Sequence, residues 1–431
     1  MQQEITQNAP QAGTDITNIL DTVARMGRLL LQNGAEIHRV EDTMKRVAAH
    51  FGVVEDEFFV LSNGIFITGG DKSHKRLYAN VRHIPVQGTR MDRIVAINQL
   101  SREIIADGLT LAEISQRLDA IETMPQQKTL MRLLGACLSS MAFCLIYGGT
   151  PFDCVAAGIA GLLLYVFVIF ISEKYLSKIT GNLFGGALAT LICVLLCELG
   201  IGTDMHYMVI GAIVTLIPGV AMTYGVRDIA SGDYLSGIVR MLDAILVFCC
   251  IAIGVGSVVK LGIRLVGLGY QAVSPASQPA MLYVPMEAMA AFAGTVGFAI
   301  LFCVPGIYRV ACGLIGMAGW LFYLLLTHVG LPAPYATFFA SFLVVLTSRY
   351  VAVLKKSPAT VFMVAGLFPL IPGAGFYWTA YYLVSGETAT AGTTGFGAIK
   401  AVIGLVLGIV CVLELPGAMF QFGHKKHKKR D

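Results

Sequence analysis

The chain has 431 residues, of which 56% are hydrophobic and 13% are charged, and its mean hydropathy is +0.71. These values exclude an ordinary water-soluble globular protein and indicate a polytopic α-helical membrane protein that sits in a lipid bilayer. The formal net charge is only +4, and we expect no nucleic-acid partner.

The first part of the chain has charged residues throughout and predicts a cytoplasmic α+β domain at 15–128, after a disordered tail at 1–14. Thr14 or Asp15 can cap a first helix that ends at Asn33-Gly34, and a second helix follows over about 35–50. Runs of β-branched and aromatic residues between turn residues then predict three strands, followed by two more helices. The strands are expected at 58–61, 65–68 and 77–81, and the helices near 90–106 and 110–121.

This domain offers little recognisable chemistry. The stretch 64–73 superficially resembles a phosphate-binding loop, but Asp71 stands in it and would repel phosphate. The polar side chains of segment 38–42 fit either a polar site or the solvated face of the second helix. All ten cysteines lie in the later, apolar part of the chain, and their spacing fits no metal site. We therefore expect no cofactor and no metal.

Ten apolar stretches follow residue 129 and predict ten transmembrane helices. They form two sets of five, so we expect a first five-helix membrane repeat at 129–260, an outer loop at 261–281, a second repeat at 282–420 and a basic cytoplasmic tail at 421–431. Glycines four residues apart, as at Gly404 and Gly408, permit close helix packing within one chain or between the subunits of a homo-oligomer.

Lysine and arginine in the short loops predict the orientation of the spans. Most of these residues fall on one side together with the basic tail, whereas only Lys260 and Arg264 fall on the other side. Loops rich in lysine and arginine face the cytoplasm. We therefore expect a multi-pass protein of the cell (inner) membrane with both termini in the cytoplasm.

The fourth stretch of each set is interrupted by the same four residues, at Leu216-Ile217-Pro218-Gly219 and at Leu370-Ile371-Pro372-Gly373. Proline removes a helical hydrogen bond and glycine adds backbone freedom, so each helix should break near the middle of the membrane. Lipid tolerates such a break only where it is buried in protein or lines a cavity. Paired breaks are therefore the best pointer in this sequence to a transport site.

The two sets also align outside the breaks. Placing Ala142-Phe143 on Gly297-Phe298 brings Gly158 and Gly161 onto Gly313 and Gly316, and Tyr165 onto Trp320. Because each set has an odd number of spans, the second set must enter the membrane from the opposite side. The sequence thus predicts an inverted 5+5 repeat with a pseudo-twofold axis in the membrane plane.

Candidate substrate groups cluster around the two breaks. The N-terminus of a half-helix suits a substrate carboxylate, and unpaired carbonyl groups suit an ammonium group or a cation. The alternative is that the prolines only kink the helices for packing. The predicted substrate-binding residues are Thr215, Pro218, Gly219, Thr223, Tyr224, Pro369, Pro372, Gly373, Gly375, Tyr377 and Trp378.

Ionisable residues near membrane depth are candidates for coupling, because their desolvation demands a partner or a wet cavity. Asp243 lies in the fifth span with Arg240 one turn earlier, and the two could form an ion pair. Glu287 lies at the repeat position of Arg132, and Lys400 lies inside the tenth span. For Asp243, Glu287 and Lys400, a structural ion pair is an equal alternative to a transport role.

The run from Asn33 to Asp42 (NGAEIHRVED), followed by the strand-rich segment and ten spans, resembles the threonine/serine exporter family. Some members carry the two membrane modules as separate polypeptides, and here they are fused. The resemblance implies a secondary active exporter of small hydrophilic amino acids such as threonine and serine. It also implies an ion gradient as the driving force, with the proton as the expected coupling ion, while some relatives are thought to move dicarboxylates.

Other function classes are the alternatives to amino-acid export. A dicarboxylate exporter of the same family would share the architecture. An intramembrane hydrolase would need a metal-binding histidine pair, a serine elbow or an aspartate pair, and no span supplies these, so we expect no enzyme. A channel could also use broken helices. Saturation and counterflow measurements would separate a carrier from a channel.

Overall fold

The computed structural model describes residues 16–53, 55–70, 77–84, 88–230, 232–266 and 284–420. Several predicted features lie outside these residues: the tail at 1–14, the helix cap at Thr14 or Asp15, most of the expected outer loop and the basic tail at 421–431. Cα packing divides the chain into two compact units. The first comprises residues 1–126 and 233–239, and the second comprises 127–232 and 240–431.

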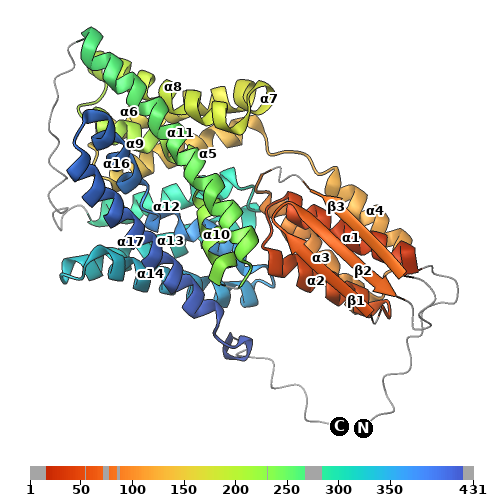
Figure 1. The fold of residues 1–431 in the computed structure, drawn as a ribbon. Coiled ribbons are helices and arrows are strands. Elements are labelled where there is room, and N and C mark those ends of the chain that lie inside the picture. The colour runs from red at the N-terminus through yellow and green to blue at the C-terminus, as the bar shows by residue number, and fades with distance from the viewer. Residues whose placement is uncertain are drawn as a thin grey trace. The chain divides into compact units, whose positions relative to one another are not determined.

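All seven helices and strands between Ile16 and Glu122 begin and end within about three residues of the predicted bounds. A three-stranded antiparallel sheet of order β1-β2-β3 packs against helices (Figure 1). Its elements are α1 (Ile16–Gln32), α2 (Ile37–His50), β1 (Glu55–Leu61), β2 (Gly64–Gly70), β3 (Leu77–His83), α3 (Met91–Asp107) and α4 (Leu111–Glu122).

Strand alternation explains how the sheet packs. Successive side chains of a strand point to opposite faces. Phe58, Val60, Ile65 and Ile67 are buried, whereas their strand neighbours, such as Phe66, are exposed. The amphipathic helices α1 and α2 bury their apolar stripes in the same core, because both repeat apolar residues at helical spacing.

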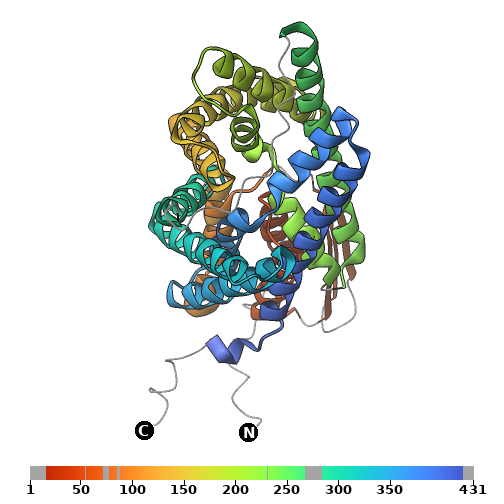
Figure 2. The same ribbon diagram turned by 90° about the vertical axis from the view of Figure 1, so that its left-hand side faces the viewer.

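The second unit is a bundle of long apolar helices, shown in two views in Figures 1 and 2. Among the described residues, eight helices are long and apolar enough to cross a membrane, and two bent pairs bring the number of spans to ten if each pair counts as one. The unbroken spans are α5 (Thr129–Ile146), α6 (Pro151–Phe167) with its extension to Tyr175, α8 (Lys178–Glu198), α11 (Tyr234–Val266), α12 (Val284–Leu301), α13 (Gly306–His328), α14 (Ala333–Leu354) and α17 (Thr388–Leu413).

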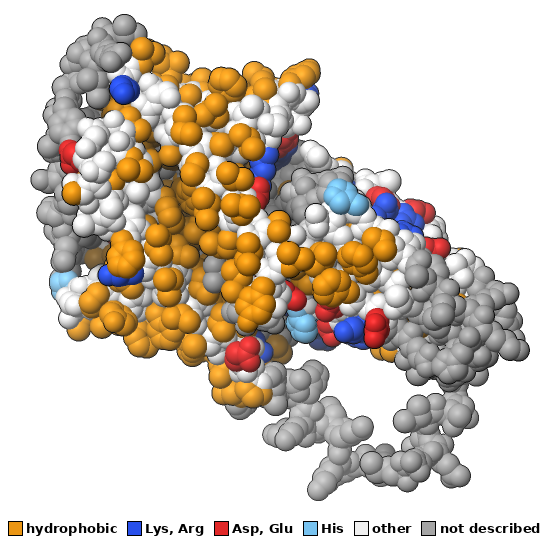
Figure 3. Space-filling view, in the orientation of Figure 1, with side chains coloured by type: hydrophobic (Ala, Val, Ile, Leu, Met, Phe, Trp, Pro, Cys, Tyr) orange, Lys and Arg blue, Asp and Glu red, His pale blue; other side chains and the backbone are white. Residues whose placement is uncertain are grey.

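The outer surface of this unit is apolar. Hydrophobic side chains cover most of the face visible in Figure 3, and charged side chains on it are few. Large side chains such as Leu195, Ile253 and Leu407 are about half exposed on the long helices. A soluble protein rarely exposes so continuous an apolar surface, whereas lipid favours it. The chain is a polytopic α-helical membrane protein.

Two details differ from the prediction. Helix α11 continues to Val266, so the segment 261–266 is helical where the outer loop was expected to begin. A π-helical turn at Val168–Ser172 lies between α6 and the short helix α7 (Glu173–Tyr175). Such turns insert one extra residue per turn and have no signature in hydrophobic spacing, so the sequence could not indicate it.

Helices α5 and α6 pack against each other as α12 and α13 do. A Cβ atom added to Gly161 would overlap Ser140, and one added to Gly316 would overlap Thr295, the residue aligned with Ser140. Helices α5 and α12 also contact each other directly, and the aligned Phe143 and Phe298 rings meet edge to face with centroids 5.5 Å apart. The pair α5 and α6 therefore packs in the same way as the pair α12 and α13.

Candidate functional site

The two interrupted spans have the same backbone course. Helix α9 (Met205–Ile213) passes through a 3-10 turn at Val214–Leu216 before α10 (Gly219–Ala230) begins. Helix α15 (Ala359–Leu367) passes through a 3-10 turn at Phe368–Leu370 before α16 (Gly373–Ser385) begins. The bends are 60° and 44°. The predicted breaks are thus present at both proline-glycine pairs.

Proline and glycine create the same local turn at each break. The Gly219 amide donates to the Ile217 carbonyl at 2.8 Å, and the Gly373 amide donates to the Ile371 carbonyl at 2.7 Å. Pro372 has φ −75° and ψ 55°, the conformation of an inverse γ-turn. Because this short bond replaces the helical ladder, the first amides of α10 and α16 have no carbonyl one turn earlier to which they could donate.

The breaks contact each other reciprocally. A Cβ atom added to Gly219 would lie 2.6 Å from Cδ1 of Ile371, and one added to Gly373 would lie 2.7 Å from Cδ1 of Ile217. Each glycine therefore accommodates the isoleucine that precedes the proline of the other break. A larger residue at either glycine would force the side chain of the facing isoleucine to shift.

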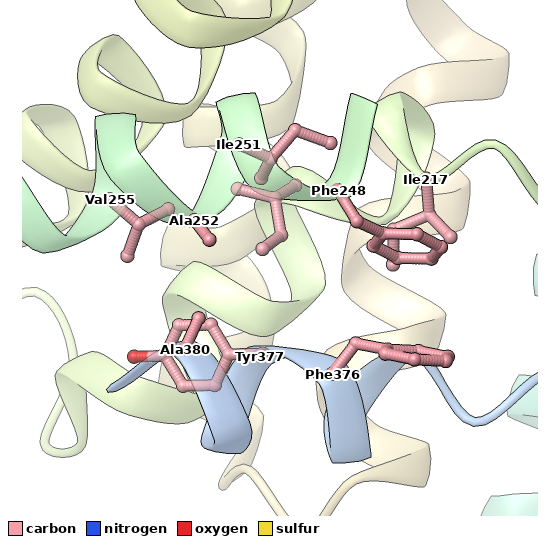
Figure 4. A pocket seen from close by; sticks show the side chains of 10 residues that line it. Ile217, Phe248, Ile251, Ala252, Val255, Phe376, Tyr377 and Ala380 are labelled. Carbon is pink, nitrogen blue, oxygen red and sulfur yellow. The ribbon is translucent and has the colours of Figure 1, made fainter. Parts of the chain in front are cut away.

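Two cavities flank this crossing, and seven lining positions of the first correspond to seven of the second. The first has a cavity volume of about 20 Å³ and lies between α11 and α16 (Figure 4). The second, of about 10 Å³, lies between α10 and α17. The shared positions of the first cavity are Ile217, Phe248, Ile251, Ala252, Gly373, Phe376 and Tyr377, and those of the second, in the same order, are Ile371, Val402, Leu405, Val406, Gly219, Met222 and Thr223. A constant sequence offset relates every pair.

A buried histidine lies next to the first cavity and contacts Tyr377 in its lining. His206, at the start of α9, is 7% exposed, and its Nδ1 lies 3.0 Å from the hydroxyl of Tyr377. Its ring also packs against Trp378 and Tyr381, with centroids 5.1 and 4.6 Å away. Sequence reasoning missed His206, although a single histidine in an apolar span was a usable signal.

The remaining predicted substrate residues divide by their surroundings. Thr215 has a buried hydroxyl without a hydrogen-bond partner in the part of the chain that the structure describes. Thr223 donates to the Gly219 carbonyl of its own helix at 2.8 Å. Tyr224 lies under the guanidinium group of Arg240, 5.5 Å from the ring centroid. Gly375 faces Ala398 of α17.

Pro218 and Pro372 lie within the breaks themselves. Pro369 is buried in the 3-10 turn that precedes the second break. The predicted substrate residues around Pro218, Gly219, Pro372, Gly373 and Tyr377 therefore come together at the crossing.

The structure does not bring the three coupling candidates together. Asp243 forms an ion pair with Lys178. The predicted ion pair between Asp243 and Arg240 was therefore wrong. Arg240 instead lies 3.3 Å from Asp228, and both side chains are largely buried. The local spacing of Arg240 and Asp243 suggested a pair, but the Asp243 carboxylate points across to α8 rather than along its own helix.

Glu287 is 5% exposed and accepts a hydrogen bond from the indole nitrogen of Trp320 at 3.2 Å. The aligned residues behave alike, since Arg132 lies over the ring of Tyr165. Lys400 lies on an exposed face of α17, with its ammonium group 4.6 Å from the ring centroid of Phe396. Lys400 lies inside the tenth span, as predicted, and its face of the helix points outward.

The sequence analysis also missed a buried acid. Asp153, at the start of α6, is fully buried and accepts hydrogen bonds from the amide of Thr150 at 2.9 Å and from the amides of Thr203 and Asp204 at 2.5 and 3.0 Å. It closes a capping box and ties the loop before α9 to α6. Among the described residues, no group of three or more His, Cys, Asp and Glu side chains could hold a metal ion.

Comparison with known proteins identifies the family. Residues 21–262 match the family model described as "Putative threonine/serine exporter", and residues 287–414 match the one described as "Threonine/Serine exporter, ThrE". No solved structure matches the chain.

Curated relatives agree with these matches. The threonine/serine exporter of Corynebacterium glutamicum is 23% identical over 93% of this chain and 84% of its own. The probable threonine/serine exporter of Mycobacterium tuberculosis is 21% identical over 87% of this chain and 72% of its own. The pheromone-regulated membrane protein 10 of Yarrowia lipolytica is 23% identical over 55% of this chain but only 20% of its own. The chain belongs to the threonine/serine exporter family.

Proposed function

We propose that this protein exports threonine, serine and similar small hydrophilic amino acids by secondary active transport, with the substrate held at the crossing of the two broken spans. The observation that carries the proposal is the pair of matched cavities on either side of the reciprocal Gly219–Ile371 and Gly373–Ile217 contacts. The names of the bacterial relatives supply the substrate class.

An inverted five-plus-five repeat accounts for this geometry. A pseudo-twofold axis through the crossing would exchange Gly219 with Gly373 and one cavity with the other. It would also bring Phe143 onto Phe298, which are in contact as residues near such an axis must be. In alternating access, one repeat moves against the other around a fixed site. Two matched cavities then provide one lining for each of two opposite states.

The crossing offers groups suited to a zwitterion. The Gly219 and Gly373 amides already donate to Ile217 and Ile371, but later amides in the first turns of α10 and α16 carry partial positive charge and can receive a carboxylate. Carbonyl groups of the 3-10 turns that end α9 and α15 can receive an ammonium group. The hydroxyls of Thr215 and Tyr377 lie next to these ends and can receive a substrate hydroxyl, while the apolar lining suits the threonine methyl group.

The setting of this activity is also proposed. The excess of lysine and arginine on one side favours a cytoplasmic location for both termini and for residues 16–126, in the inner membrane. An ion gradient would supply the energy. The first unit would then regulate or assemble the transporter from the cytoplasm.

The test uses the full-length protein in proteoliposomes. Vesicles loaded with unlabelled threonine, serine or succinate are placed in labelled solute, and counterflow is recorded for each. We expect counterflow of threonine and serine. Counterflow of succinate alone would assign a dicarboxylate exporter, and flux that neither saturates nor shows counterflow would assign a channel.

Variants locate the site. Gly219→Val and Gly373→Val should each abolish counterflow, because valine cannot fit against the opposing isoleucine. Gly397→Val, on α17, is the matched control, since a Cβ atom there meets nothing within 4 Å. Leu405, which lines the second cavity, would be unsuitable as a control. Normal counterflow in both correctly inserted glycine variants would place the substrate elsewhere.

A further inference from the structure

The proposed repeat is least symmetric at the hydrogen bond between His206 and Tyr377. Tyr377 lines the first cavity, whereas the matched position in the second cavity is Thr223, whose hydroxyl donates to a carbonyl of its own helix. The position matched to His206 is Thr360. A titratable group therefore stands beside one cavity and is replaced by a hydroxyl beside the other.

The bond joins elements from the two halves of the membrane unit. His206 lies in α9 of the first set of spans, and Tyr377 lies in α16 of the second. It therefore bridges the half-helices that must separate if the two halves move against each other. Figure 4 shows Tyr377 on α16, opposite the α11 side chains that line the cavity.

Charging His206 would change this bond. A neutral imidazole has one donor and one acceptor nitrogen, so it can share a single hydrogen with the Tyr377 hydroxyl in either direction. An imidazolium has two donors and no acceptor. Tyr377 must then accept, and its own hydroxyl hydrogen needs a new acceptor. Among the described residues, the structure records no other hydrogen-bond partner for that hydroxyl.

Burial of His206 disfavours a charged ring, and two features of the surroundings oppose that effect. Aromatic rings of Trp378 and Tyr381 pack around it, and ring faces attract cations. Two cations lie on the elements packed against α9, Arg132 on α5 and Lys178 on α8, and they form ion pairs with Glu173 and Asp243. The other titratable groups that we consider on these elements carry no positive charge. They are Asp204 at the helix start, Asp153 on α6, Cys193 on α8, Tyr147 on α5, and Tyr381 and Tyr382 on α16.

Asp204 offers a carboxylate beside His206, at the start of α9, to which a proton from water can bind on its way to the ring. Its carboxylate accepts the backbone amide of His206 at 2.9 Å, so it lies at the end of α9 where the helix leaves the apolar core. Partial positive charge at a helix N-terminus disfavours an imidazolium, whereas the nearby carboxylate favours it. These opposing effects leave the protonation of His206 sensitive to its surroundings, which a switch requires.

We propose that His206 is the proton-coupling residue of this exporter and that its protonation releases α16 from α9. A proton from water adds to the free ring nitrogen, and the Tyr377 hydroxyl then leaves for a new acceptor as α16 moves. The proton returns to water on the other side when the neutral ring and the bond re-form. This inference rests on the proposed function, because coupling requires transport.

Two assays in the same proteoliposomes test it. Counterflow of labelled threonine at equal pH measures exchange, and accumulation under an imposed pH gradient measures coupling. For His206→Gln we expect persistent counterflow and loss of the gradient-driven accumulation. His328→Gln, an exposed histidine at the end of α13, is the matched control and should retain both activities.

Tyr377→Phe keeps the titratable imidazole of His206 and removes only the hydroxyl group that bonds to it. We expect it to shift the pH at which counterflow is half-maximal, which a purely structural role for the hydroxyl would not do. Wild-type protein without counterflow would refute the proposed function. Normal counterflow with unchanged gradient-driven accumulation in His206→Gln would overturn the coupling role and leave the proposed function intact. If His206→Gln does not fold, an unchanged pH profile in Tyr377→Phe would overturn it in the same way.

Discussion

The reciprocal glycine–isoleucine contacts allow a compensation experiment at the crossing. A methyl group added by Gly219→Ala would lie 2.6 Å from Cδ1 of Ile371 and 3.1 Å from Cζ of Phe368. One added by Gly373→Ala would lie 2.7 Å from Cδ1 of Ile217 and 3.4 Å from the Tyr147 hydroxyl. Both changes therefore overpack the same kind of contact.

The magnitude follows from which neighbours can move. Overpacking a well-packed core costs about 1–3 kcal/mol, which corresponds to roughly a 5- to 150-fold change in the population of the affected state. We expect Gly219→Ala to lie near the upper end, because the Phe368 ring is stacked on Phe298 with centroids 3.7 Å apart and cannot retreat. Gly373→Ala should be milder, since only the end of an isoleucine must shift.

Valine restores the missing space, because Ile→Val removes Cδ1. Ile371→Val alone should cost about 0.5–1.5 kcal/mol, yet it should recover threonine efflux when combined with Gly219→Ala. Ile217→Val should likewise recover Gly373→Ala. The mismatched double variant Gly219→Ala with Ile217→Val should show no recovery.

Efflux from loaded proteoliposomes is the assay, normalised to folded protein and accompanied by thermal melting of each variant in detergent. Gly397→Ala serves as the control for a glycine of a membrane helix in open space. Equal recovery by matched and mismatched valines, or wild-type efflux in both alanine variants, would show that the contacts do not limit transport.

Three further predictions concern other parts of the chain. In a background without native cysteines, a thiol at exposed Thr388 should react with an impermeant reagent outside cells and one at exposed Lys355 should not; the opposite pattern would invert the proposed orientation. Asp153→Asn should lose charge-assisted bonds of about 1.5–3 kcal/mol each and lower the melting temperature, whereas Glu198→Gln, exposed on α8, should not. Hydrogen bonds from its N-cap threonine lower the pKa of Glu113, so this contribution to stability is present above the ordinary pKa and fades as the pH falls through the lowered one; Glu113→Gln should destabilise α4 in hydrogen exchange at pH 6 and make no difference at strongly acidic pH.

Local chemistry made most of the fold predictable. Apolar length fixes a membrane span, strand alternation fixes which face of a sheet is buried, and proline followed by glycine fixes a break. Each of these depends on residues close together in the sequence. The π-helical turn after α6 and the extension of α11 escaped prediction because neither changes the apolar pattern that marks a span.

Tertiary contacts made the site harder to predict. Asp243 was expected to pair with Arg240 one turn away, but it pairs with Lys178 on another helix. Spacing along one helix cannot show which side chain a neighbouring helix presents. The hydrogen bond between Glu287 and Trp320 was easier to foresee. The alignment of the two sets matches Glu287 with Arg132 and Trp320 with Tyr165, and Arg132 and Tyr165 are also in contact.

Symmetry and its exceptions have different consequences for the proposed transport cycle. Matched breaks and cavities give two states of similar packing, so the energy needed to exchange them can be small. Net export against a substrate gradient, however, requires coupling to an ion gradient, and a titratable group beside only one of the two cavities is a difference through which a proton can act. His206 and Tyr377, set against Thr360 and Thr223, are such a difference beside the cavity. Replacing the pair therefore tests whether coupling takes place at the crossing or elsewhere.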